Sequence, residues 1–95
     1  MNKSLSVNVE VRFADGLISH ELTYESESIS LNKVLFSLSE IESTMKMFEN
    51  KDGSVVLLPG FLMVLNKRMI QPWEAENTVV RDGQSLRFVQ VVAGG

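Results

Sequence analysis

Residues 5–25 read LSVNVEVRFADGLISHELTYE, and this stretch decides the fold. Apolar and polar side chains alternate from Leu5 to Phe13, which is the pattern of a strand with one buried face. Asp15-Gly16 is a turn signal, because glycine tolerates the positive φ that tight turns require. A second alternating run follows over residues 17–25. The stretch therefore predicts an antiparallel β-hairpin with one apolar face.

The spacing of apolar residues then changes from two to about 3.6, which is typical of an amphipathic helix. Ser28 and Ser30 are candidate N-caps for this helix. The turn-rich residues 50–53 would end it. We therefore expect one helix over residues 31–48, lying across the sheet. Its apolar stripe consists of Leu31, Val34, Leu35, Leu38, Ile41, Met45 and Phe48.

The second half of the chain predicts two or three more strands. These are residues 61–65 after Pro59-Gly60, a short run at 68–71, and residues 85–92. The order of elements favours an α+β fold of the ubiquitin-like β-grasp type, with a mixed four- to five-stranded sheet and one main helix packed across it. The last strand can lie parallel to the first, because a crossover containing a helix separates them. We expect a single domain over residues 1–92 and a flexible tail over residues 93–95.

Composition excludes several classes of protein. The net charge of −3 and the scattered basic residues argue against a nucleic-acid partner. No apolar run approaches the length of about 18 residues that a membrane helix needs, so no membrane partner is expected. The acidic residues of the first half, which predict a solvated face, are Glu21, Glu25, Glu27, Glu40 and Glu42. Cysteine is absent, which suits the reducing cytoplasm and leaves no thiol to carry sulfur.

Residues 66–95 read NKRMIQPWEAENTVVRDGQSLRFVQVVAGG and carry the most specific pattern in the chain. An Asn-led turn, a Trp in the next loop, Asp82-Gly83 before the last strand and the final Gly94-Gly95 resemble the ThiS/MoaD family of ubiquitin-like sulfur carrier proteins. The helix and the strand after Pro59-Gly60 are similar to the MoaD branch. Gln90-Val91 favours the ThiS branch, whereas the length favours MoaD or the ubiquitin-like modifiers. The pathway therefore stays open.

The resemblance implies a chemistry at the carboxylate of Gly95. A partner enzyme would adenylate that carboxylate with ATP, and sulfur would then replace one oxygen, giving a thiocarboxylate for molybdopterin, thiamine or related biosynthesis. The chain itself would be a carrier rather than an enzyme and would bind no cofactor, and its partners would be the adenylating enzyme and a sulfur-accepting synthase subunit. Gly94 and Ala93 would let the tail thread a narrow channel, because small residues allow close backbone approach. The alternative is a ubiquitin-like modifier conjugated through Gly95 to target lysines.

The final strand also predicts a docking surface. Alternation places Leu86 and Phe88 toward the helix, and Met63 and Leu65 of the neighbouring strand face the same way. The residues that face outward and form an apolar patch beside the tail are Leu62, Val64, Val89 and Val91. Exposed apolar patches of this kind mark partner surfaces. The alternative is that a loop of the same chain covers the patch.

Two conspicuous side chains have simpler interpretations. His20 is the single histidine, and without cysteine or a carboxylate cluster it predicts neither a metal site nor a catalytic triad. We expect it on an edge strand or at the surface. Trp73 follows Pro72, and we expect it to cover the core rather than to anchor a partner.

Overall fold

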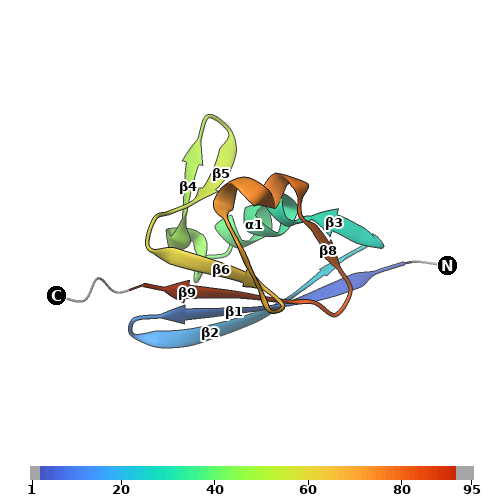
Figure 1. The fold of residues 1–95 in the computed structure, drawn as a ribbon, viewed down its shortest axis with the longest axis horizontal. Helices are drawn as coiled ribbons and strands as arrows, with labels where there is room; N and C mark the ends of the chain where they lie inside the picture. Colours follow the sequence, from blue (N-terminus) through green and yellow to red (C-terminus); the bar gives the residue numbers. More distant parts are fainter. Residues whose placement is uncertain (1–2, 92–95) are drawn as a thin grey trace.

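The computed structural model describes residues 3–91, which build a five-stranded sheet with a helix across one face (Figure 1). The order of strands across the sheet is β2-β1-β9-β6-β7. β1 pairs antiparallel with β2 and parallel with β9, so the sheet is mixed. The strands are β1 (Leu5–Phe13), β2 (Gly16–Tyr24), β6 (Phe61–Leu65), β7 (Arg68–Ile70) and β9 (Ser85–Gln90). The predicted β-grasp arrangement and the parallel pairing of the first and last strands are confirmed.

The main helix α1 (Leu31–Ser39) begins where the sequence predicts. Ser30 is its N-cap, and the hydroxyl of Ser30 accepts a hydrogen bond from the backbone N–H of Asn32. The prediction that the helix continues over residues 31–48 is wrong. Residues 40–44 form turns, η1 (Met45–Met47) is a short 3₁₀ helix, and Phe48 already belongs to a strand.

Hydroxyl side chains explain why α1 stops early. The Thr44 hydroxyl donates to the carbonyl oxygen of Leu38 at 2.6 Å, and the Ser39 hydroxyl donates to that of Phe36 at 2.6 Å. Such bonds satisfy the last carbonyls of a helix and compete with its continuation. Thr44 is fully buried, so the turn that it stabilises is part of the core. The helical spacing of apolar residues does not reveal this competition, so it does not predict where the helix ends.

Four short strands and a second 3₁₀ helix complete the fold. β3 (Ser28–Ser30) pairs with β8 (Val79–Arg81), and β4 (Phe48–Lys51) forms a hairpin with β5 (Ser54–Leu57). This hairpin stands above the sheet on the helix side (Figure 1). η2 (Pro72–Asn77) follows β7, and it begins with a capping box between Gln71 and Glu74.

The core lies between α1 and the inner face of the sheet (Figure 1). Leu86 and Phe88 are fully buried, Met63 is 1% exposed and Leu65 is 7% exposed, so the predicted inward residues are confirmed. Phe88 meets Phe48 edge to face, with ring centroids 6.2 Å apart. Among residues 3–91, no helix is long and apolar enough to cross a membrane. The predicted limits of the domain and its tail involve residues 1–2 and 92–95, which lie outside the described residues.

Candidate functional site

The site is the end of β9, where the chain leaves the sheet. Two hydrogen bonds fix this end from opposite sides. The backbone N–H of Ala14, in the turn between β1 and β2, donates to Oε1 of Gln90 at 2.9 Å. The backbone N–H of Val91 donates to the carbonyl oxygen of Gly60 at 2.7 Å. The end of β9 is therefore held to the β1–β2 turn on one side and to the turn at Gly60 on the other.

Sequence reasoning missed both anchors of this exit. Gly60 has a φ of +98°, a conformation that favours glycine, and this conformation belongs to the turn that presents the carbonyl to Val91. The Pro59-Gly60 pair predicts a turn, but it does not predict which N–H group binds the carbonyl of Gly60. Gln90 continues a strand of alternating residues, and only the register of β9 beside the β1–β2 turn reveals its role.

An apolar patch lies beside this exit on the outer face of the sheet. Leu62 of β6 pairs directly with Val89 of β9. Leu62 is 40% exposed and Val91 is 50% exposed, while Val64 and Val89 are half-buried. Met69 extends the patch, because it pairs with Val64 and is 50% exposed. The four residues predicted to face outward do so, and no loop among residues 3–91 buries them.

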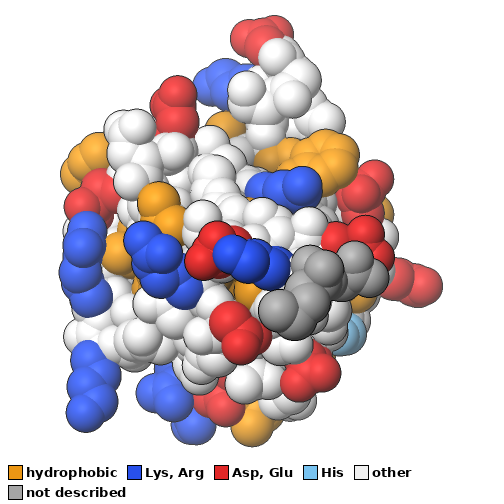
Figure 2. All heavy atoms as spheres, turned by 90° about the vertical axis from the view of Figure 1, so that its right-hand side faces the viewer, with side chains coloured by type: hydrophobic (Ala, Val, Ile, Leu, Met, Phe, Trp, Pro, Cys, Tyr) orange, Lys and Arg blue, Asp and Glu red, His pale blue; other side chains and the backbone are white. Residues whose placement is uncertain are grey.

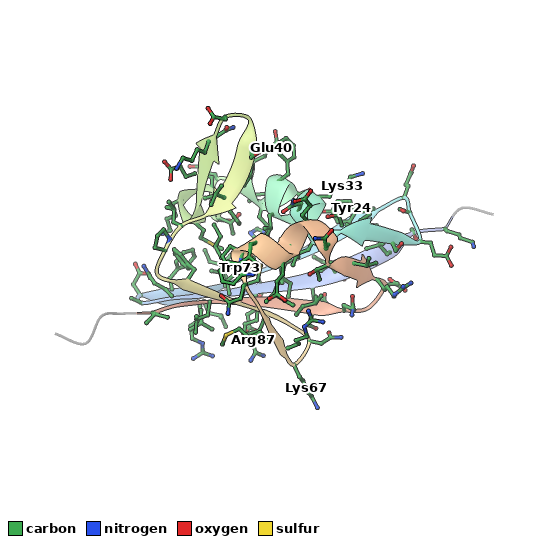
Figure 3. All side chains as sticks on the ribbon, turned by 45° about the horizontal axis from the view of Figure 1, so that its top comes forward. Tyr24, Lys33, Glu40, Lys67, Trp73 and Arg87 are labelled. Carbon is green, nitrogen blue, oxygen red and sulfur yellow. The ribbon has the colours of Figure 1, made fainter. Side chains whose placement is uncertain are left out.

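Basic side chains border the outer-face patch of Leu62, Val64, Met69, Val89 and Val91. Arg12 of β1 pairs in register with Val89, and its side chain is exposed. Arg87 lies opposite Val64, and its Nε is 3.3 Å from Oε1 of Glu10. Figure 3 shows Arg87 on the side of the sheet opposite to Tyr24 and the helix. The patch therefore offers apolar contact together with positive charge, which suits a partner with an acidic rim.

The residues predicted to carry the chemistry lie outside the described residues. These are Gly95 as the attachment point, with Gly94 and Ala93 as the threading segment. What the structure does describe is the platform before them, from Ser85 to Val91.

Trp73 does not cover the core, so that prediction is wrong. Its side chain is 76% exposed at the start of η2, and Figure 3 shows it on the outside of the fold. The capping box accounts for this position, because it fixes the turn of η2 so that Ala75, not Trp73, points inward at 0% exposure. Trp73 borders a shallow apolar groove with Leu35, Val56 and Pro72.

Residues 3–91 contain no constellation that resembles a catalytic or metal site. No group of three metal-ligating side chains occurs among them. His20 lies on the edge strand β2, as predicted, and its Nε2 is 2.8 Å from the hydroxyl of Ser43. Burial raises the pKa of Tyr24, and a hydrogen bond with Ser37 opposes that rise. Both residues connect β2 to the helix side of the molecule and are structural.

A family model matches residues 5–95, which is nearly the whole chain and includes Gly94-Gly95. The chain belongs to the ThiS family. Members of this family are small ubiquitin-like carrier proteins rather than enzymes, and the β-grasp fold and the exit at β9 agree with that class.

The fold also matches a solved structure from Haloferax volcanii. The solution structure of its HVO 2177 protein aligns with a TM-score of 0.67, covering 97% of this chain and 88% of that one. The two sequences are 21% identical, so this likeness concerns the fold alone. No curated protein sequence is similar enough to this chain to count as a match.

Proposed function

We propose that this member of the ThiS family carries sulfur as a thiocarboxylate on Gly95. The observation that carries the proposal is that the family match continues through Gly94-Gly95 on a chain without cysteine. An ionised carboxylate is a poor electrophile, and α-carboxyl groups have a pKa of about 3.3–3.7, so activation must come first. In the proposal, a carboxylate oxygen of Gly95 attacks the α-phosphorus of ATP on a partner enzyme and pyrophosphate leaves.

Sulfur transfer then follows from the acyl-adenylate. A sulfur nucleophile attacks the acyl carbon and AMP leaves with the carboxylate oxygen, so one sulfur replaces one oxygen. The chain contributes the acyl group and a fixed exit, while ATP and the catalytic residues belong to the partner. Gly94 and Ala93 lack bulky side chains, which favours passage through a narrow channel. A sulfur-accepting synthase subunit in the cytoplasm would take the thiocarboxylate as a nucleophile.

The outer-face patch supports the proposed complex with the adenylating enzyme. Leu62 and Val89 are neighbours across β6 and β9, and the exposed Val91 lies at the exit. A partner that covers the patch would therefore hold the exit of the tail at its own active site. Arg12 at the border of the patch would attract a partner with an acidic docking surface.

Intact-mass spectrometry tests the proposal directly. The chain is incubated with the activating enzyme of its own source, ATP and sulfide. The expected product has exchanged one oxygen for sulfur at Gly95, and Gly95→Val should not be converted. Isopeptide-linked Gly-Gly remnants on other proteins, without the sulfur exchange, would instead favour the protein modifier. Conversion of Gly95→Val at the normal rate would contradict the proposal.

A further inference from the structure

Among residues 3–91, no strand pairs with the outer edge of β2. β2 is the outermost strand of the sheet, with β1 on its inner side. On β1, the backbone N–H of Asn8 donates to the carbonyl oxygen of Gln84 at 3.1 Å and the carbonyl of Ser6 accepts from Gly83 at 2.9 Å, so even-numbered residues bond toward β9. Odd-numbered residues of β1 therefore bond to β2, and their partners are its even-numbered residues. The N–H and C=O groups of Leu17, Ser19, Glu21 and Thr23 point to the open edge.

This edge lacks the features that normally protect a strand from pairing. β2 has nine residues and contains no proline, lysine or arginine. The opposite edge strand, β7, has three residues and begins at Arg68, directly after Lys67. Short length and basic side chains discourage pairing at a sheet edge, whereas a long, regular edge without them is a template for another strand. Only the β7 edge is protected in this way.

β2 is also held rigidly in its extended form. The hydroxyl of Tyr24 donates to the hydroxyl oxygen of Ser37 on α1 at 2.8 Å, and Nε2 of His20 lies 2.8 Å from the hydroxyl of Ser43. Together with nine register pairs to β1, these contacts fix the strand from one side while its edge stays open. A segment that pairs with β2 would not have to order it first, which lowers the entropic cost of binding.

The side chains along the edge define what would fit there. On the inner side, the half-buried Ile18 borders an open groove with Ile41, Glu42 and Lys46. On the outer side, Glu21 is exposed, and Asp15 and Glu25 flank the ends of the strand. Lys46 is already engaged, with its Nζ 4.2 Å from the centre of the Phe13 ring. Figure 2 shows Lys and Arg mostly toward the left of this face, whereas Asp and Glu are spread over its top, bottom and right.

We propose that the edge of β2 binds an extended segment of a partner protein, which adds to the sheet as a sixth strand. Because side chains alternate along a strand, the segment would place apolar residues toward Ile18 and Leu22 and lysine or arginine residues toward Glu21. Backbone hydrogen bonds to Leu17, Ser19, Glu21 and Thr23 provide the affinity, and the acidic side chains select a basic segment. β1 lies between this edge and the outer-face patch, so a segment added at β2 leaves the patch open to a second partner. The inference is independent of the chemistry proposed for Gly95.

A designed peptide tests this docking surface on the intact chain. The probe is a labelled nine-residue peptide in which valine and lysine alternate, and the comparison peptide alternates valine and glutamate. Titration followed by amide chemical shifts should perturb Leu17, Ser19, Glu21 and Thr23 most strongly. The glutamate peptide should bind at least about fivefold more weakly because of the acidic border. Absence of binding at millimolar peptide, equal binding of both peptides, or perturbations centred on Leu62 and Val89 would each overturn the proposal.

One pair of variants isolates the backbone contribution. Ser19→Pro removes an N–H that faces the open edge and leaves the pairing with β1 intact, whereas Ser19→Ala keeps that N–H. Ser19→Pro should weaken binding of the lysine peptide at least about tenfold, and Ser19→Ala should bind like the original chain. Equal affinities for the two variants would overturn the proposal.

Two further measurements keep the test decisive. If Ser19→Pro does not fold, two peptides are used instead, each N-methylated on one of the two alternating sets of residues. Retained affinity of both peptides would overturn the proposal. The same titration without peptide is run across protein concentrations. Concentration-dependent shifts confined to β2 would assign the edge to a second copy of this chain and would also overturn it.

Discussion

The two faces of the central sheet are built from the same strands but differ in their exposure. On the inner face, Phe88 and Leu86 are fully buried. On the outer face, their sequence neighbour Val89 is half-buried, and Leu62 beside it is 40% exposed. Adjacent residues of a strand point to opposite faces of the sheet. The inward residues therefore form the core, whereas the outward residues remain available to a partner. Variants of adjacent residues should separate stability from recognition.

Phe88→Ala should have the largest effect on stability. Phe88 is fully buried and packs edge to face on Phe48, so its truncation leaves a cavity in the middle of the core. Truncations of this kind cost about 3–5 kcal/mol in the free energy of unfolding. Val89→Ala, one residue away on the half-buried outer face, should cost about 1 kcal/mol or less. Urea denaturation followed by circular dichroism measures both variants, and equal losses would contradict the distinction between the faces.

Leu62→Asp should leave the fold nearly unchanged and impair recognition. Leu62 is exposed, so the free energy of unfolding should change by about 0.5 kcal/mol. A carboxylate in the middle of the outer-face patch would be desolvated on docking, and the rate of adenylation should fall at least about tenfold, which corresponds to about 1.4 kcal/mol. ATP–pyrophosphate exchange with the activating enzyme measures this rate.

Phe36→Asp is the matched control for that variant. Phe36 is 50% exposed, but it belongs to α1, which lies on the opposite side of the sheet from the outer-face patch. An aspartate introduced there should leave the adenylation rate within about twofold of the original chain. Equal loss of activity in both variants would show that docking does not depend on the patch beside the exit.

Gly60→Ala should destabilise the turn whose carbonyl binds Val91, because alanine disfavours the backbone conformation of that turn. The φ of Gly60 is +98°, and an added Cβ would have no heavy atom within 4 Å, so the strain comes from conformation and not from a clash. We expect a loss of about 1 kcal/mol in the free energy of unfolding. Gly16→Ala is the control, because that glycine also has open space and has no positive φ. Equal thermal midpoints for the two variants would contradict a strained turn at Gly60.

Sequence periodicity predicted the sheet well because alternation and turn residues are local signals. β1 and β6 have the predicted bounds, Leu5–Phe13 and Phe61–Leu65. The inward and outward residues of β6 and β9 were also assigned correctly, since their alternation follows from strand geometry alone. The short strands β3 and β8 were missed, because three residues contain too little alternation to detect.

Features that depend on side-chain hydrogen bonds or on contacts between distant segments were not predictable in the same way. The predicted helix was longer than the observed one, because the Thr44 hydroxyl donates a hydrogen bond to the Leu38 carbonyl. The spacing of apolar residues does not encode this bond. Trp73 was expected to cover the core, but η2 begins with a capping box between Gln71 and Glu74 and leaves Trp73 76% exposed. In the candidate site, the outer-face patch followed from alternation, whereas the anchors Gly60 and Gln90 required the register between distant segments.

Tyr24→Phe should have a modest effect on stability that depends on pH. Tyr24 lies half-buried at the border of the inner face, where burial raises the pKa of its hydroxyl and the hydrogen bond with Ser37 partly opposes the rise. Above the ordinary pKa of about 10, the unfolded chain releases this proton before the folded chain does, so the folded state binds more protons and loses stability as the pH rises.

Loss of the hydrogen bond makes the phenylalanine variant less stable than the original chain at pH 8, by about 1 kcal/mol. Phenylalanine has no proton to lose, so the difference between the two proteins should narrow as the pH rises above about 10. Urea denaturation at pH 8 and pH 11 measures this difference. A gap of the same size at both pH values would mean that the hydroxyl of Tyr24 titrates alike in the folded and unfolded chains, and that the inner face is open to water at this border.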